Sequence, residues 1–200
     1  LDDTLNNNPK RVMELSNHII SRRLKIEWVC MGRTDVLDED MYRIMRRAGC
    51  VEIAFGVESL DPEVRCAMGK GSSVENVESV TKMTQRSGIE AKWYLMVGSP
   101  SPENLKSAEI TARGLEKMRP NKIRVFKTIP YPGTTYFNNP SLHVLPEYQG
   151  KWEHWWANNM PKNPYGDLTG ITYTDLMSAE EIERARQMLF TAHLRYGGAV

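Results

Sequence analysis

The feature that most constrains the fold is the run from Val51 to Ser59, with the sequence VEIAFGVES. It is apolar with one charged interruption until Gly56 and Glu58 close it, a pattern typical of a buried parallel strand whose carboxyl end opens onto a site. The stretches 89–100 (IEAKWYLMVGSP) and 123–134 (IRVFKTIPYPGT) repeat this pattern. Because ligands bind at the carboxyl ends of parallel strands, we expect the three segments to share one pocket.

Helix and strand patterns alternate along the first part of the chain. Asn8 followed by Pro9 predicts the start of a helix, which should run to about Leu24. Residues 25–30 (KIEWVC) indicate a short strand, and Asp38 is expected to cap the next helix.

The alternation continues after the central strand. Ser72 with Glu75 predicts a capping box for a long helix, and Ser101–Pro102 is expected to start another helix. Residues 122–129 then complete four predicted strands. The expected fold class is therefore α/β: a partial (β/α) TIM-like barrel of parallel strands, truncated at its amino terminus.

The pattern changes at Pro130. From there to Asp175 the chain is rich in proline and aromatic residues, and it predicts a long irregular segment of the kind that often carries function. Its aromatic side chains would either plug an open barrel end or contact a substrate. Ser178 with Glu181 predicts a capping box for a terminal helix. We expect residues 1–134 to form the C-terminal part of the barrel, and 135–200 to complete the domain.

Bulk properties exclude several classes of partner. The net charge of +1 gives no electrostatic case for nucleic acid, and no apolar run approaches the length of a membrane helix. Three cysteines, an odd number without the spacing of a disulfide framework, favour a reducing, cytoplasmic setting. The opening residues 1–4 (LDDT) look like the tail of a strand, so we expect the chain to be a fragment of a longer protein.

Two charged residues fall at the ends of successive predicted strands. Arg33 and Glu58 could clamp a small zwitterion or a sugar diol, although either alone is more often a structural ion pair. Gly56 and Gly98 remove side chains where the backbone would approach a ligand, or simply serve turns. The turn at 131–134 (YPGT) could wall an adenine ring or be a plain type II turn.

An ordered set of motifs makes the combination more specific. These are WVCMGRTD (28–35), AGC (48–50), FGVES (55–59), KGS (70–72), MVGSP (96–100) and PYPGT (130–134). In order and spacing they resemble the second half of a radical S-adenosylmethionine (SAM) catalytic domain. The resemblance covers roughly residues 1–134 and is greatest to the branch that often follows a cobalamin-binding domain.

The resemblance implies SAM bound across the strand ends of a partial barrel, beside a [4Fe-4S] cluster. The enzyme would then generate a 5′-deoxyadenosyl radical, with methyl transfer or cyclisation of a small-molecule substrate as possible outcomes and with cobalamin as an optional further cofactor. Several residues would contact SAM. They are Asp3 near the methionine amino group, Arg33 near its carboxylate, Glu58 with Ser59 at the ribose, and Gly98, Thr128 and Pro130 near adenine.

The sequence departs from the family at the cluster. The CxxxCxxC motif is absent, and Cys30, Cys50 and Cys66 are each expected to be buried core thiols rather than ligands. The cluster ligands should therefore lie upstream of Leu1, and this segment alone should hold no metal and be inactive. The missing strand would leave a sheet edge through which the chain could self-associate.

Two alternatives remain open at this stage. A different parallel α/β barrel enzyme, for example one that binds phosphate, would need a glycine-rich loop, and only residues 97–101 (VGSPS) come near one. A non-catalytic interaction domain with a degenerate barrel would explain the missing cysteine motif.

Overall fold

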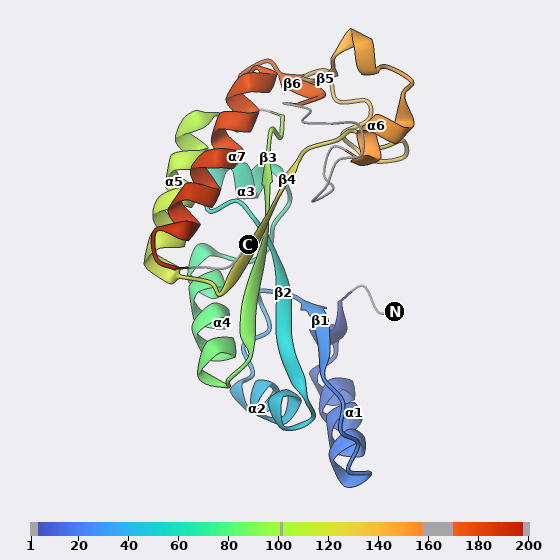
Figure 1. The fold of residues 1–200 in the computed structure, drawn as a ribbon, viewed down its shortest axis with the longest axis vertical. Helices are drawn as coiled ribbons and strands as arrows, with labels where there is room; N and C mark the ends of the chain where they lie inside the picture. Colours follow the sequence, from blue (N-terminus) through green and yellow to red (C-terminus); the bar gives the residue numbers. More distant parts are fainter. Residues whose placement is uncertain (1–3, 101, 158–169, 198–200) are drawn as a thin grey trace.

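The computed structural model describes residues 4–100, 102–157 and 170–197. A sheet of four parallel strands in the order β1-β2-β3-β4 runs through it, confirming the predicted α/β class (Figure 1). The strands are β1 (Trp28–Gly32), β2 (Cys50–Glu58), β3 (Glu90–Val97) and β4 (Lys122–Lys127).

Helices separate the strands in sequence, as predicted. They are α1 (Pro9–Ser21), α2 (Glu39–Arg47), α3 (Pro62–Ala67), α4 (Val74–Arg86), α5 (Leu105–Met118) and α7 (Ala179–Leu194), with a 3₁₀ turn η1 (Leu5–Asn7) before them. In Figure 1, α2, α4, α5 and α7 lie on one side of the sheet. No helix in the described parts of the chain is long and apolar enough to cross a membrane.

The helix caps show which local signals decided the structure. Asn8, Asp38 and Ser178 cap α1, α2 and α7 as predicted. The Ser72–Glu75 capping box is wrong, because Ser73 caps α4 and the Ser72 side chain bonds elsewhere. The predicted helix start at Ser101–Pro102 is also wrong, because Asn104 forms the cap and a capping box with Ser107.

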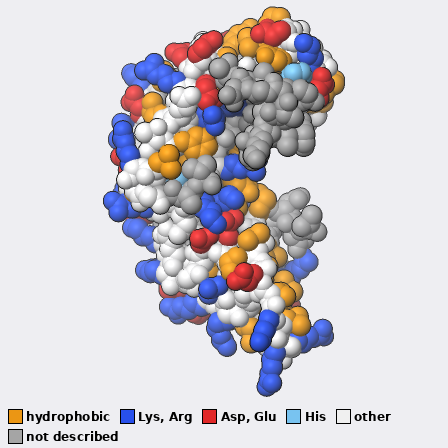
Figure 2. Space-filling view, in the orientation of Figure 1, with side chains coloured by type: hydrophobic (Ala, Val, Ile, Leu, Met, Phe, Trp, Pro, Cys, Tyr) orange, Lys and Arg blue, Asp and Glu red, His pale blue; other side chains and the backbone are white. Residues whose placement is uncertain are grey.

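The core lies between the sheet and these helices. Along β3, Ala91, Trp93, Leu95 and Val97 are buried, while the side chains between them are only half-buried. Strict alternation means that one face of the sheet packs against helices and the other is partly open. Figure 2 shows the molecule hollowed on one side, between an upper and a lower lobe.

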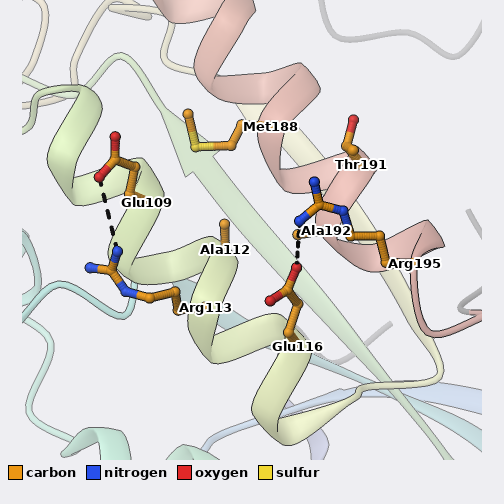
Figure 3. A pocket seen from close by; sticks show the side chains of 8 residues that line it. All are labelled: Glu109, Ala112, Arg113, Glu116, Met188, Thr191, Ala192 and Arg195. Atoms are coloured by element: carbon orange, nitrogen blue, oxygen red, sulfur yellow. Dashed lines mark hydrogen bonds and ion pairs between the residues drawn. The ribbon is translucent and has the colours of Figure 1, made fainter.

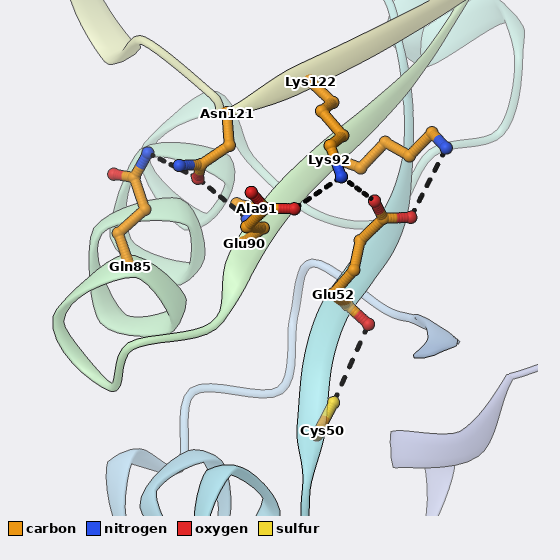
Figure 4. A network of polar contacts seen from close by, with 8 residues as sticks. All are labelled: Cys50, Glu52, Gln85, Glu90, Ala91, Lys92, Asn121 and Lys122. Carbon is orange, nitrogen blue, oxygen red and sulfur yellow. Dashed lines mark hydrogen bonds and ion pairs between the residues drawn. The ribbon is translucent and has the colours of Figure 1, made fainter. Parts of the chain in front are cut away.

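The partly open face carries a charged network at the amino ends of the strands (Figure 4). Glu52 on β2 accepts hydrogen bonds from Lys92 on β3 at 3.4 Å and from Lys122 on β4 at 2.8 Å. Lys122 also donates to Glu90 at 2.5 Å. These ion pairs connect β2, β3 and β4 at the end of the sheet opposite the candidate site, and the Glu52–Lys122 pair reaches across β3.

The segment after β4 is more ordered than its composition predicted. It contains β5 (Leu142–Val144) and β6 (Thr172–Thr174), which pair antiparallel in a second sheet. It also contains the turn η2 (Pro146–Tyr148) and the short helix α6 (Trp152–Ala157). The prediction of an irregular segment is therefore corrected: Ile129, Trp155 and Ile171 form a small core of its own.

Candidate functional site

The carboxyl end of β2 holds Glu58 in an unusual backbone conformation. Its φ is 63°, in the left-handed region that side chains other than glycine seldom adopt. Its carboxylate Oε1 accepts a hydrogen bond from Lys70 Nζ at 3.0 Å, and Lys70 also donates to the carbonyl of Gly56 at 3.1 Å. Such strain persists where the surroundings fix it, and it is common at binding sites.

Gly56 makes room for that carboxylate. A Cβ atom at position 56 would lie 2.8 Å from Glu58 Oε1 and 3.5 Å from Lys70 Nζ. A side chain at position 56 would therefore have to displace the Glu58 carboxylate from its present place beside Lys70. The sequence analysis named Gly56 and Glu58, but it did not identify Lys70 as the partner that holds the carboxylate.

Arg65 on α3 joins the ends of β1 and β2. The side chain is buried and donates to the carbonyls of Val57 and Ser59 at 2.8 Å each. It also donates to the Ser72 carbonyl at 2.6 Å and to the Ser72 hydroxyl at 2.9 Å. The Ser72 hydroxyl lies 2.6 Å from that of Thr34, so one buried guanidinium ties three loops together. The sequence reasoning missed this residue.

Arg33 follows β1 directly but does not join the Glu58 group through any described contact. Its guanidinium is about half exposed and makes a fork with the Asp35 carboxylate, at 2.8 and 2.5 Å. The hydrogen bond from Arg33 is the main cause that lowers the pKa of Asp35. Its backbone is fixed by the buried Asn6, whose Oδ1 accepts from the Arg33 amide at 2.7 Å.

The end of β3 is closed by a buried acid. Gly98 has a φ of 80°, and the amide of Ser99 donates to Glu103 Oε2 at 2.6 Å. Burial raises the pKa of Glu103 to about 7, although hydrogen bonds from Ser99 and from the Gly98 backbone oppose the shift. Glu103 thus fixes the loop that follows β3, a role that the sequence did not reveal.

The end of β4 continues this polar layer. The Thr128 hydroxyl donates to the Val97 carbonyl at 3.1 Å and lies 3.3 Å from the Ser99 hydroxyl. The backbone carbonyl of Thr128 accepts a hydrogen bond from the Thr172 hydroxyl at 2.9 Å. Pro130 is buried next to it. The predicted turn at 131–134 is present, because the Thr134 amide bonds to the Tyr131 carbonyl and Gly133 has a φ of 84°.

Two further residues connect the strand ends. The Ser59 hydroxyl is buried, accepts from the Asp61 amide at 3.1 Å and lies 3.3 Å from Thr111 on α5. Burial is the main cause that raises the pKa of the Tyr136 hydroxyl. This pKa is lowered by a hydrogen bond with Ser99 and raised by the negative charges of Glu103 and Glu58. The structure thus brings Glu58, Ser59, Gly98, Thr128 and Pro130 to one edge of the sheet.

The remaining predictions concern Asp3 and the cysteines. Asp3 lies outside the described residues. Cys50 is buried as expected, Cys30 is half-buried, and Cys66 is exposed, which corrects the prediction that all three are core thiols. The described part of the chain contains no group of three or more potential metal ligands. Its cysteines therefore do not fit an iron–sulfur cluster.

A pocket of about 300 Å³ lies away from these strand ends, between α5 and α7 (Figure 3). Residues of α5, of α7 and of its C-cap Arg195 line it. The Arg113–Glu109 ion pair lies along α5, and the Arg195–Glu116 pair joins the two helices. These pairs are exposed, so they contribute little to stability. The strand ends remain the better candidate site.

The chain is similar to known proteins both in sequence and in fold. A family model described as the radical SAM superfamily matches residues 3–113. An uncharacterized methyltransferase of Pyrococcus horikoshii is 29% identical over 134 residues, which are 67% of this chain and 29% of the relative. Bacteriochlorophyllide d C-12(1)-methyltransferase of Chlorobaculum tepidum is 29% identical over 142 residues, 68% of this chain and 30% of that protein. The chain thus spans about three tenths of the length of these relatives.

Solved structures show the same fold. The radical SAM methyltransferase TsrM from Kitasatospora setae, solved with cobalamin and a [4Fe-4S] cluster, has a TM-score of 0.63 at 16% identity. That match covers 73% of this chain and 32% of TsrM. Methylornithine synthase PylB has a TM-score of 0.58 at 16% identity, over 93% of this chain and 44% of its own. The family model covers more than half of the sequence, and the fold of the chain agrees with these structures. The chain therefore belongs to the radical SAM superfamily.

Proposed function

We propose that the strand ends of this chain bind SAM, and that the chain is the SAM-binding part of a radical SAM enzyme. The observation that supports this most is Glu58. A carboxylate at the end of a central parallel strand, held by Lys70 in a left-handed backbone conformation, is positioned before any ligand arrives. A carboxylate can accept hydrogen bonds from both hydroxyls of a ribose.

The other strand ends offer surfaces suited to the rest of SAM. Adenine would lie near the backbone of Gly98 and near Pro130. The side of Gly98 on which a Cβ would stand is filled by Ile182, 2.8 Å from that position, so the ligand would approach the glycine from its other side. The Ser59 and Thr128 hydroxyls bond to the protein itself, so we assign them to shaping the pocket. Arg33 would approach the SAM carboxylate by exchanging its Asp35 partner for the ligand. Asp3 keeps its proposed place at the amino group.

These residues bind and orient a cofactor rather than perform chemistry themselves. Bound SAM would supply either its methyl group, by transfer to a nucleophile without reduction, or, on one-electron reduction, a reactive adenosyl-derived radical. The buried network of Arg65 and Ser72 keeps the loops after β1 and β2 in place around it. The described cysteines do not fit a cluster, so we propose that its ligands lie in another part of a longer protein.

Methyl transfer is the reaction that the relatives favour. Two of the curated relatives carry methyltransferase names, and TsrM is a methyltransferase solved with cobalamin. We therefore propose methyl transfer to a small molecule, with cobalamin as a second cofactor. Cyclisation, which the motifs also allowed, has no comparable support among these relatives.

Hydrogen exchange measured with and without SAM tests the proposal. SAM is expected to slow amide exchange at residues 56–59, 98–99 and 128–129, at the ends of β2, β3 and β4. The amides of α1, which lie away from these strand ends, serve as an internal control. Protection confined to α5 and α7, or protection nowhere, would contradict the proposed site.

A further inference from the structure

The segment after β4 forms a second pocket, and we propose that it binds the flat, uncharged ring system of the substrate. The inference rests on the proposed function, because it names the substrate class that the neighbouring SAM site would act on. The pocket has a volume of about 390 Å³, within the range of small-molecule sites. Pro130, at the end of β4, lines it and thereby links it to the strand ends.

Aromatic and proline rings form much of the pocket wall. Phe137, Trp152, Trp155 and Tyr173 line it, together with proline rings from Pro130 and Pro146. These rings present flat apolar surfaces, and polar groups of His143, Gln149 and the backbone lie beside them. Aromatic faces bind planar rings by offset or edge-to-face stacking, which adds about 0.5–1.5 kcal/mol to the burial of area alone.

The exposed fraction of each aromatic side chain shows which ones form the small core and which ones could contact a ligand. Trp155 is only 4% exposed, and its indole N–H donates to the Tyr148 carbonyl at 2.7 Å, as in a folded core. Trp152 packs edge-on against it with ring centroids 4.5 Å apart, yet is 50% exposed. Phe137 is 43% exposed. Large apolar side chains left exposed around a concavity mark a binding site more often than a core.

The polar groups of the pocket suit a neutral ligand. His143 stacks on Tyr173 at 4.7 Å, and its Nε2 lies 2.9 Å from Asp175 Oδ1. This contact orients the imidazole edge, and Gln149 adds an amide to the lining. None of the residues lining the pocket is Lys, Arg, Asp or Glu, so no formal charge would be matched there. The ligand is therefore a planar ring held by stacking and by one or two hydrogen bonds.

Titration of indole into the chain tests this inference, with cyclohexanol as an apolar ligand that is not flat. Saturation-transfer NMR measures binding of both. Indole is expected to bind at least tenfold more tightly than cyclohexanol, and Trp152→Ala is expected to weaken indole binding at least tenfold. Trp152→Phe should restore most of it. Leu176→Ala is the matched control, because Leu176 is 48% exposed but does not line the pocket.

The outcomes separate this inference from the proposed function. Equal binding of indole and cyclohexanol, or indole binding that Trp152→Ala leaves unchanged, would overturn the ring-binding pocket. Titration of SAM into the same variants gives the second readout, and Trp152→Ala should leave SAM affinity unchanged. A chain that binds indole at Trp152 but not SAM would refute the SAM site and retain the pocket. A chain that binds SAM but not indole would refute the ring-binding pocket and retain the SAM site.

Discussion

Two regions of this chain use opposite means to hold a site. At the ends of β2 and β3, buried and half-buried polar groups are bonded to one another: Glu58 with Lys70, Arg65 with backbone carbonyls, and Glu103 with the Ser99 amide. In the segment after β4, aromatic rings surround a pocket whose lining includes no acid or base other than His143. The first region fits a charged, hydroxyl-rich ligand, and the second fits a flat, uncharged one.

The two regions also differ in what supports them. The parallel sheet has a continuous core that includes Phe55, Trp93 and Leu95. The second region has only a small core around Trp155. Substitutions in the large core are expected to lower the stability of the whole domain. Substitutions in the aromatic segment, which has only a small core of its own, are expected to affect mainly that segment.

The largest effect on stability is expected from replacing a buried tryptophan, and each region contains one. Trp93→Ala should cost about 3–5 kcal/mol of unfolding free energy, because it leaves a cavity in the main core and removes the N–H bond to Thr81. Trp155→Ala should mainly loosen its own segment. Urea unfolding measures the first and hydrogen exchange the second. Equal losses of global stability would contradict the division into two regions.

A pH series tests the buried acid at the end of β3. The folded-state pKa of Glu103 is about 7, above its ordinary value near 4.5, so the unfolded state loses its proton first. Stability should therefore fall as the pH rises from about 4.5 to 7 and then level off. Each pKa unit corresponds to about 1.4 kcal/mol, so the fall is on the order of 3 kcal/mol.

Glu103→Gln is the variant that isolates this effect. The amide can still accept from Ser99 but does not ionise, so this component of the pH dependence should disappear. The free energy of unfolding at several pH values between 4 and 8 provides the measurement. An unchanged slope in the variant would show that another group is responsible.

Arg65 offers a smaller but more local test. Arg65→Met should cost about 2 kcal/mol, because it leaves the carbonyls of Val57, Ser59 and Ser72 without their donor. Arg43→Met is the control, since Arg43 makes only exposed ion pairs and should cost less than about 1 kcal/mol. Thermal unfolding compares the two. Similar losses would mean that the buried network adds nothing.

The smallest effect on stability is expected at the sheet edge. Val29 and Met31 are exposed on β1, which pairs only with β2 among the described strands. If the chain self-associates through this edge, Val29→Lys should weaken that association while changing stability by less than about 0.5 kcal/mol. Leu37→Lys, at a similarly exposed site outside the strand, is the control. Sedimentation showing a monomer at every concentration would refute self-association.

The sequence predicted those parts of the fold that depend on local pattern. The central strand, the βα alternation and the caps at Asn8, Asp38 and Ser178 follow from spacing and residue type within a few positions. The parallel order of the strands confirmed the fold class. Motif order also predicted the family, which Glu58 and Gly98 helped to identify.

Other features depended on contacts that no local pattern contains. Lys70 lies 12 positions from Glu58, and Arg65 bonds to Ser59, earlier in the chain, and to Ser72, later in the chain. Ser72 failed as a helix cap because Arg65 and Thr34 compete for its hydroxyl. Likewise β5 and β6 are three residues each and distant in sequence, so neither shows the alternation that identifies a strand. Long-range polar partners were thus the part that the sequence could not supply.

The central claim is that Glu58 holds SAM, and isothermal titration of SAM tests it most directly. Glu58→Gln is compared with Glu52→Gln, which changes the same residue type on the same strand but at its opposite end, among Lys92 and Lys122. We predict that the wild-type chain and Glu52→Gln bind SAM alike, and that Glu58→Gln binds at least tenfold more weakly. Equal affinity of the two variants, or no binding by the wild-type chain, would contradict the account.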